Sequence, residues 1–149
     1  EVMGYKIPFG EGEIINAIKE TIKVNKVKAG YIRPLIFYGY GSMSLEPEGA
    51  KQHLIIAVWP WGAYLGEEVV KVKVSKYIRL HPKSSNMNAK ISGHYFNSTL
   101  AHEEVVKQGY DEALLLDYKG NIAEGPGENL FIIKDGKIKT PRICMIDLV

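Results

Sequence analysis

Lys90 stands in the stretch NAKISGHYFNSTLAHEE, residues 88 to 104, where its close neighbours are small or polar rather than charged. A primary amine in such a setting is either an ordinary surface lysine or a buried group with a chemical task. The second case matters because burial disfavours the ammonium form, and an uncharged amine is both a nucleophile and a base. The residues around Lys90 leave both interpretations open.

Two carboxylates and one arginine also stand in positions that are unusual for a purely structural domain. Glu124 and Glu128 bracket a rigid Gly-Pro-Gly turn in AEGPGENLF, and Arg33 interrupts the apolar run YIRPLI. A charge in an apolar setting needs a partner, and a constrained turn can aim a carboxylate in one direction. The structural alternatives are a solvated loop for the glutamates and an edge-strand position from which the arginine reaches solvent.

Aromatic side chains gather in VWPWGAY, where Trp59, Trp61 and Tyr64 lie close together in the sequence. Clustered aromatic rings beside a turn either fill a core or line a ligand pocket. The nearby glycine patterns GYG and GPG match neither the phosphate-binding loop nor the dinucleotide-binding fingerprint. A nucleotide site of either kind is therefore not expected.

The elements that must position these residues begin with a helix and two strands. Residues 11 to 28 place isoleucines and valines near a helical period, which predicts a surface helix packed on a core. Residues 29 to 39 and 53 to 61 are rich in β-branched and aromatic side chains and are separated by a turn-rich stretch. The first part of the chain therefore predicts α/β layering.

The second half predicts antiparallel β structure with one helix. A strand is expected over residues 72 to 80, and a helix over residues 92 to 108 that ends at Gly109. Strands are also expected within residues 111 to 117 and 122 to 141, with hairpin turns at YKGN and KDG. In this arrangement Lys90 precedes the helix, and Glu124 lies between strands.

Composition limits the class of protein. The chain has 149 residues and is 46% apolar, so it can build one domain or two small lobes. Its 19 basic and 17 acidic residues are scattered and give a net charge of +2, so no nucleic-acid partner is expected. The single Cys144 forms no internal disulfide, and neither it nor His94 and His102 has metal-ligand spacing, which favours a cytoplasmic protein without a metal. Apolar runs stay well short of the ~20 residues that span a bilayer, and no signal peptide opens the chain, so we expect no membrane partner.

Five motifs in order resemble one enzyme family. YIRPLIF, PWGAYLG, NAKISGHYFNSTLA, GYDEALLLD and AEGPGENLFIIKDG, over about residues 31 to 141, are similar to the branched-chain amino acid aminotransferases. These enzymes belong to the fold-type IV family, which uses pyridoxal 5'-phosphate (PLP). The KxxGxYxNS and EGxGENLF signatures are specific for this fold. The first two motifs resemble the branched-chain enzymes more than D-amino acid aminotransferases or aminodeoxychorismate lyases.

The resemblance implies a role for each polar group of the signatures. Lys90 matches the lysine that forms the Schiff base with PLP and then carries a proton between the substrate Cα and the C4' position of the cofactor. A desolvated pocket would help this amine to lose its proton. Glu124 matches the carboxylate that keeps the pyridine nitrogen protonated, and Tyr95 matches the tyrosine that hydrogen-bonds the phenolic oxygen of the cofactor.

The resemblance also implies a substrate pocket for small amino and keto acids. Arg33 would receive a substrate carboxylate, because a planar guanidinium supplies both charge and orientation. Tyr31, Trp61 and Tyr64 would line an apolar pocket for the side chains of leucine, isoleucine and valine, with 2-oxoglutarate as amino acceptor. The loop from residue 43 to residue 45 matches one that reaches the pocket of the partner subunit in family dimers.

The implied fold is an incomplete α+β chain of fold-type IV. Residues 1 to 70 would end a small α/β lobe, residues 71 to 88 would form the connection and the first strand of the large lobe, and residues 89 to 149 would begin that cofactor-binding lobe. The arginine and the turn that hold the cofactor phosphate would lie before and after this chain, and the tail RICMIDLV departs from the family pattern.

Without the arginine and the turn that hold the cofactor phosphate, the chain alone is expected to bind PLP weakly. Losing about three charge-assisted hydrogen bonds, at ~1.5 to 3 kcal/mol each, weakens binding by roughly three to six powers of ten. We also expect self-association as a dimer or higher oligomer, or association with a complementary fragment. The alternatives are a catalytically weak or inactive relative that acts as a binding or interaction module, and an α/β binding domain without catalysis.

Overall fold

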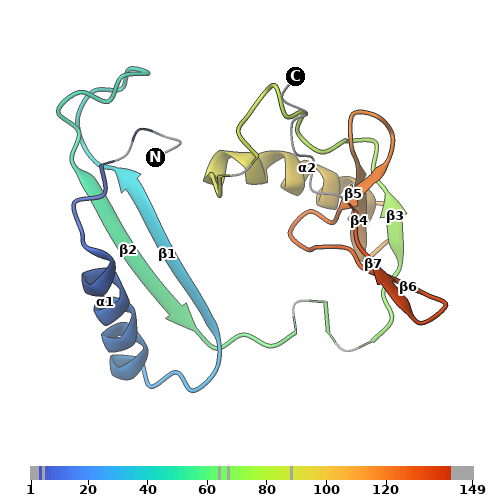
Figure 1. The fold of residues 1–149 in the computed structure, drawn as a ribbon, viewed down its shortest axis with the longest axis horizontal. Coiled ribbons are helices and arrows are strands. Elements are labelled where there is room, and N and C mark those ends of the chain that lie inside the picture. The colour runs from blue at the N-terminus through green and yellow to red at the C-terminus, as the bar shows by residue number, and fades with distance from the viewer. Residues whose placement is uncertain (1–3, 5, 64, 67, 88, 142–149) are drawn as a thin grey trace. The chain divides into compact units, whose positions relative to one another are not determined.

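The computed structural model describes residue 4 and residues 6–63, 65–66, 68–87 and 89–141. The chain separates into two compact units, Glu1–Gly66 and Glu67–Val149 (Figure 1). Helices and strands both occur, as expected of an α+β chain. The family lobe boundaries stated above remain predictions, because these units are defined by contacts within this chain alone.

The first unit is a helix beside a two-stranded antiparallel ribbon. Helix α1 spans Glu11–Val24, β1 spans Tyr31–Tyr38 and β2 spans Gln52–Trp59, and α1 lies along β2 (Figure 1). The helix ends four residues before the predicted residue 28, since Lys26 has a left-handed backbone with φ of 54°. The two strands confirm the sequence prediction and bring the start of β1 beside the end of β2.

The second unit contains a three-stranded sheet in the order β3-β4-β5. Strand β3 spans Val72–Val74, β4 spans Glu112–Leu116 and β5 spans Ile122–Glu124. Strands β4 and β5 are antiparallel, as expected of a mostly antiparallel lobe, and β3 and β4 form a parallel pair. The long connection from β3 to β4 contains a helix and returns the chain to the same end of the sheet, which a parallel pair requires.

The helical part of this connection carries the core of the second unit. A 3₁₀ turn, η1, spans Ser92–His94, and α2 follows at Tyr95–Val106. Gly109, with φ of 83°, lies just after the helix, which confirms the predicted stop. The buried side chains Ala101 and Val105 of α2 pack with Ala113 and Leu115 of β4.

A hairpin completes the described part of the second unit. Strands β6, Ile132–Lys134, and β7, Lys137–Lys139, are antiparallel. Asp135 and Gly136 have φ of 52° and 69°, and this left-handed pair forms the two-residue turn that KDG predicts.

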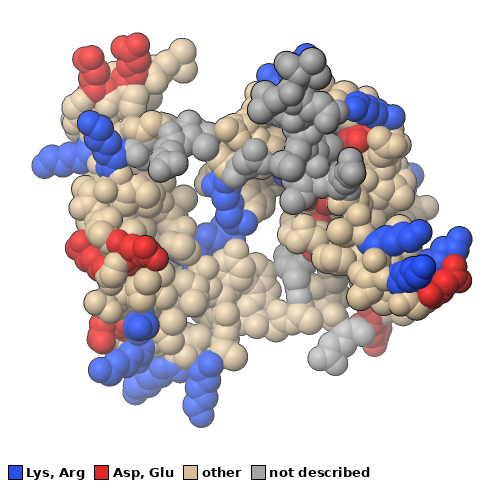
Figure 2. All heavy atoms as spheres, viewed as in Figure 1, with Lys and Arg blue, Asp and Glu red and all other residues tan. Residues whose placement is uncertain are grey.

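Charged side chains of both signs are spread over the face of the molecule drawn in Figure 2. Figure 2 shows basic and acidic side chains on several separate parts of the surface in view. Among the described residues, no helix has both the length and the apolar character needed to cross a membrane.

Candidate functional site

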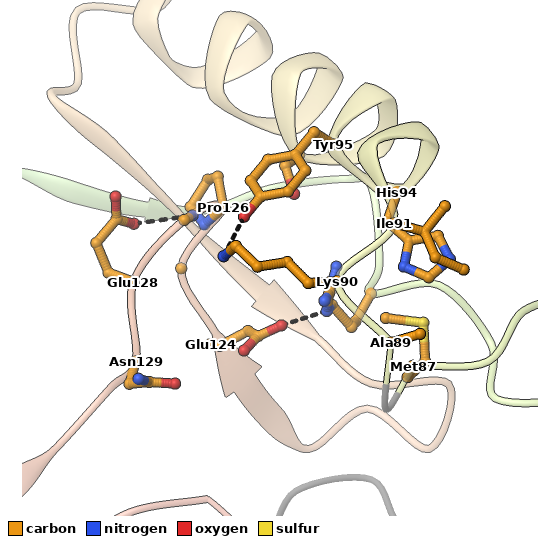
Figure 3. A pocket seen from close by; sticks show the side chains of 14 residues that line it. Met87, Ala89, Lys90, Ile91, His94, Tyr95, Glu124, Pro126, Glu128 and Asn129 are labelled. Carbon is orange, nitrogen blue, oxygen red and sulfur yellow. Dashed lines mark hydrogen bonds and ion pairs between the residues drawn. The ribbon is translucent and has the colours of Figure 1, made fainter. Parts of the chain in front are cut away.

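A hollow of about 350 Å³ in the second unit collects most of the polar residues that the sequence singled out. Its walls come from the segment before α2, the start of α2 and the turn after β5 (Figure 3). The volume is within the range of small-molecule sites. The residues that line it are Arg79, Met87, Ala89, Lys90, Ile91, His94, Tyr95, Ser98, Glu124, Gly125, Pro126, Gly127, Glu128 and Asn129.

Lys90 and Tyr95 meet in this hollow. The Lys90 Nζ atom donates a hydrogen bond to the Tyr95 hydroxyl at 2.9 Å and lies 5.5 Å from the centre of its ring. Ile91 is extended and the chain then tightens into η1, so that Tyr95 is the first residue of α2. Helical side chains lean toward the helix N-terminus, which brings the phenol back over the preceding segment.

The solvent exposure of Lys90 differs from the sequence expectation. A desolvated amine was expected, but the Lys90 side chain is exposed, and Tyr95 is 41% exposed. The lining of the hollow includes the exposed residues Lys90, Tyr95, Gly127 and Asn129, so this side of it is open to solvent. Within this chain, the hydrogen bond to Tyr95 rather than burial directs the amine.

Glu124 is the last residue of β5 and lines the same hollow. Its Oε1 atom accepts a hydrogen bond from Arg79 Nε in an ion pair between two partly buried side chains. The sequence reasoning missed Arg79. The available signal was the one that drew attention to Arg33, because Arg79 also interrupts an apolar run, YIRL.

Glu128 belongs to the turn itself. Its backbone oxygen accepts from the Gly125 N–H at 2.9 Å, and its Oε2 accepts from the Gly127 N–H at 3.2 Å. A Cβ at position 125 would lie 2.6 Å from Glu128 Oε2, so glycine leaves room for this fold-back. Burial is the main cause that raises the pKa of the Glu128 carboxyl above its usual range. The Gly-Pro-Gly turn is thus tied to Glu128, while Glu124 faces the hollow.

The residues predicted to bind substrate lie in the first unit. The rings of Tyr31, Trp59 and Trp61 form a mutual cluster, with centroids 5.1 Å apart for Tyr31 and Trp59, 4.8 Å for Tyr31 and Trp61, and 5.6 Å for the two tryptophans. Arg33 is exposed, and its Nη2 atom donates to the Tyr31 hydroxyl at 3.2 Å. Tyr64 lies outside the described residues. Arg33 and the aromatic side chains of the first unit therefore form one group.

Comparison with known proteins places these features in a family context. The family model for amino-transferase class IV matches residues 1–146. The chain is 46% identical over 146 residues to the branched-chain-amino-acid aminotransferase of Pseudomonas aeruginosa, covering 95% of this chain and 48% of that protein. It spans about half the length of the curated relatives it matches.

Two solved structures have similar backbones. The branched-chain amino acid aminotransferase of Escherichia coli superposes with a TM-score of 0.87 at 39% identity, covering 92% of this chain and 47% of that one. The branched-chain amino acid aminotransferase of Thermobaculum terrenum, in its PLP form, gives a TM-score of 0.81 at 28% identity, with coverage of 91% and 45%. The likeness therefore extends over almost all of this chain.

Proposed function

The chain belongs to the class IV aminotransferase family, and from this premise we propose that it carries the ring-binding part of a PLP-dependent branched-chain aminotransferase. The observation that carries the proposal is the convergence of Lys90, Tyr95 and Glu124 on one hollow. An amine, a phenol and a carboxylate are the three groups suited to the aldehyde, the phenolic oxygen and the ring nitrogen of PLP. The donor set therefore fits the cofactor, and the PLP form of the Thermobaculum terrenum relative supports the choice.

Each of the three side chains has a separate task in the proposed site. When bound, PLP supplies an aldehyde carbon and an electron-accepting ring. Lys90 Nζ is the nucleophile that holds the cofactor, and after substrate binding it takes the proton from the substrate Cα. Tyr95 would donate a hydrogen bond to the phenolic oxygen, and displacement by the substrate amine would free the Lys90 amine for its task. Glu124 holds the proton on the ring nitrogen.

We place substrate recognition on the cluster of the first unit. The Arg33 guanidinium is the carboxylate-binding group, and its contact with the Tyr31 hydroxyl restrains its direction. Tyr31, Trp61 and Tyr64 would bury the apolar side chain of leucine, isoleucine or valine, with 2-oxoglutarate as the amino acceptor. The name of the relatives, branched-chain-amino-acid aminotransferase, supports this choice of substrate class.

We also propose a cytoplasmic protein that acts as a dimer or higher oligomer, or together with a complementary fragment. The single cysteine supports a reducing compartment. Phe131, Ile133 and Ile138, beside and within the β6-β7 hairpin, are 60%, 75% and 70% exposed, which supports burial of this surface in an assembly.

Amino transfer tests the proposal directly. The chain is completed with the remaining segments of the Pseudomonas aeruginosa relative, and transfer of isotopically labelled nitrogen from leucine to 2-oxoglutarate is followed in the presence of PLP. We expect transfer in the completed protein, little in the 149-residue chain alone, and none after Lys90→Ala. Persistent turnover in the Lys90→Ala protein would contradict the assignment of Lys90.

The same preparation separates the alternatives. Transfer from D-alanine but not L-leucine would indicate a D-amino acid aminotransferase, and release of pyruvate from aminodeoxychorismate would indicate the lyase. No reaction and no PLP attachment in a folded protein would favour a binding or interaction module.

A further inference from the structure

Arg79 contacts the carboxylate of the hollow and stands outside the signatures that suggested the site. Its Nε atom pairs with Glu124 Oε1, and the two side chains are 22% and 32% exposed. A partly buried pair of this kind costs desolvation on both sides, and breaking it by removal of one partner leaves the other charge uncompensated. The direction of the Glu124 carboxylate therefore depends on Arg79.

The backbone that carries Arg79 is attached to two elements. The Arg79 N–H donates to the Leu116 carbonyl of β4 at 2.7 Å. The Asn97 Nδ2 atom, from the first turn of α2, donates to the Ile78 carbonyl at 2.9 Å. Asn97 is the asparagine of the KxxGxYxNS pattern, and this contact gives it a structural task beside the hollow.

We propose that Arg79 is a positioning residue that aims the Glu124 carboxylate at the ring nitrogen of PLP, and that Asn97 in turn holds the Arg79 backbone. The inference rests on the proposed function, in which Glu124 contacts that nitrogen. A carboxylate has two oxygens, so Glu124 can hold Arg79 through Oε1 and present Oε2 to the ring. The arginine therefore acts on the cofactor through Glu124.

Arg79 has a second consequence for Lys90. Both of these basic side chains line the hollow. A Glu124 carboxylate released from Arg79 would be attracted to the Lys90 ammonium, and such a pair would hold the amine in its unreactive charged form. The Arg79 guanidinium on Glu124 Oε1 competes with such a pair.

The test measures attachment of PLP to Lys90 in the 149-residue chain. The chain is incubated with PLP up to millimolar concentration, reduced with borohydride and digested, and the pyridoxyl group on Lys90 is quantified by mass spectrometry. The variants are Arg79→Gln, Glu124→Gln and the double variant. Lys107→Gln is the matched control, since it removes a cation from an exposed ion pair with Glu103 on α2.

Arg79→Gln should raise the half-saturating PLP concentration about five- to tenfold, and Lys107→Gln should leave it unchanged. In the Glu124→Gln background, Arg79→Gln should add less than about twofold, because its partner is already altered. Asn97→Ala should have a smaller effect in the same direction. If circular dichroism shows that Arg79→Gln is unfolded, Arg79→Lys replaces it, with an expected rise of about two- to fivefold.

The outcomes separate this inference from the proposed function. Absence of preferred Lys90 labelling in the wild-type chain contradicts the proposed function and this inference together. Normal labelling that neither Arg79 variant changes contradicts the role of Arg79 alone. Fully additive effects of Arg79→Gln and Glu124→Gln show that Arg79 does not act through Glu124, which also overturns the inference.

Discussion

Tyr95→Phe removes one oxygen atom from the hollow and tests the contact between the phenol and the amine. The hydrogen bond from Lys90 Nζ is 2.9 Å long, and Tyr95 is 41% exposed. A charge-assisted hydrogen bond contributes ~1.5 to 3 kcal/mol when it is buried, and exposure lowers this to about 0.5 to 1.5 kcal/mol. Since ~1.4 kcal/mol corresponds to a factor of ten, PLP attachment at Lys90 should weaken about two- to tenfold.

The lower part of this range is expected because the variant changes both states. In the free chain, the phenylalanine ring of the variant no longer accepts a hydrogen bond from Lys90, and in the bound state it no longer contacts the phenolic oxygen. The assay is the half-saturating PLP concentration for borohydride-fixed labelling of Lys90. Unchanged labelling in a folded Tyr95→Phe chain would refute the reasoning.

Tyr118→Phe is the matched control for this experiment. Tyr118 is 44% exposed, and the Lys119 Nζ atom lies 5.3 Å from the centre of its ring, so the exposure and the lysine contact resemble those of Tyr95. Loss of this hydroxyl should not change labelling at Lys90. Equal losses in both variants would show that the effect is not specific to the hollow.

Three further predictions concern stability. Gly30→Ala should destabilise the first unit by about 1 to 3 kcal/mol in chemical unfolding, because the new Cβ would lie 2.1 Å from the Trp59 backbone oxygen. Gly62→Ala is the control and should be close to neutral, because a Cβ at position 62 would have no heavy atom within 4 Å. Equal losses in the two variants would argue against the close approach. The pKa of Glu128 is raised mainly by burial, so its protonated form stabilises the fold at low pH. This contribution is lost as pH rises above 4.5. The melting temperature of Glu128→Gln should therefore increase relative to that of the wild type between about pH 4 and pH 7. The pKa of Glu104 is lowered, chiefly by a side-chain hydrogen bond from Ser75, so its contribution to stability is lost as pH falls below 4.5. Glu104→Gln should therefore be less stable than the wild type at about pH 7 and differ little from it at about pH 3. Parallel pH profiles of stability for Glu128→Gln and Glu104→Gln would contradict the opposite pH dependences expected here.

Local patterns predicted the elements that depend on neighbouring residues. The periodicity of α1, the β-branched runs of β1 and β2, the glycine after α2 and the KDG turn are all short-range signals, and the structure confirms each of them. The meeting of Lys90 with Tyr95 also follows from local geometry, because Ile91 and a 3₁₀ turn are all that separate the two residues.

The strand predicted over residues 72 to 80 begins at Val72 but ends at Val74, for a non-local reason. The alternation continues past Val74, but the Ser75 hydroxyl donates to Glu104 Oε2 of α2 at 2.9 Å and accepts from the Tyr77 N–H at 3.1 Å. These contacts bend the backbone out of the ladder, although Arg79 returns to bond with β4. A local sequence pattern does not predict that Ser75 forms a hydrogen bond with Glu104, which lies 29 residues away in the sequence.

Two polar contacts could not be derived from spacing alone. Arg79 and Glu124 are brought together by the sheet, and the sequence around an isolated arginine in an apolar run does not show which acidic residue it pairs with. His102 was given no metal role, and the structure places its Nδ1 atom 2.8 Å from Oε1 of the buried Glu112. Both pairs join a strand of the sheet to a residue outside that strand, and the periodicity of a single element does not predict such a contact.

The distribution of the pyridoxyl group over the lysines tests the central claim most directly. After a single borohydride reduction at limiting PLP, peptide mass spectrometry compares Lys90 with Lys107, which is exposed and lies on the same unit. The account predicts that Lys90 carries at least several-fold more pyridoxyl group than Lys107, and that Glu124→Gln reduces this preference. Labelling of the two lysines in equal proportion, unchanged by Glu124→Gln, would contradict the claim that Lys90, Tyr95 and Glu124 form a cofactor site.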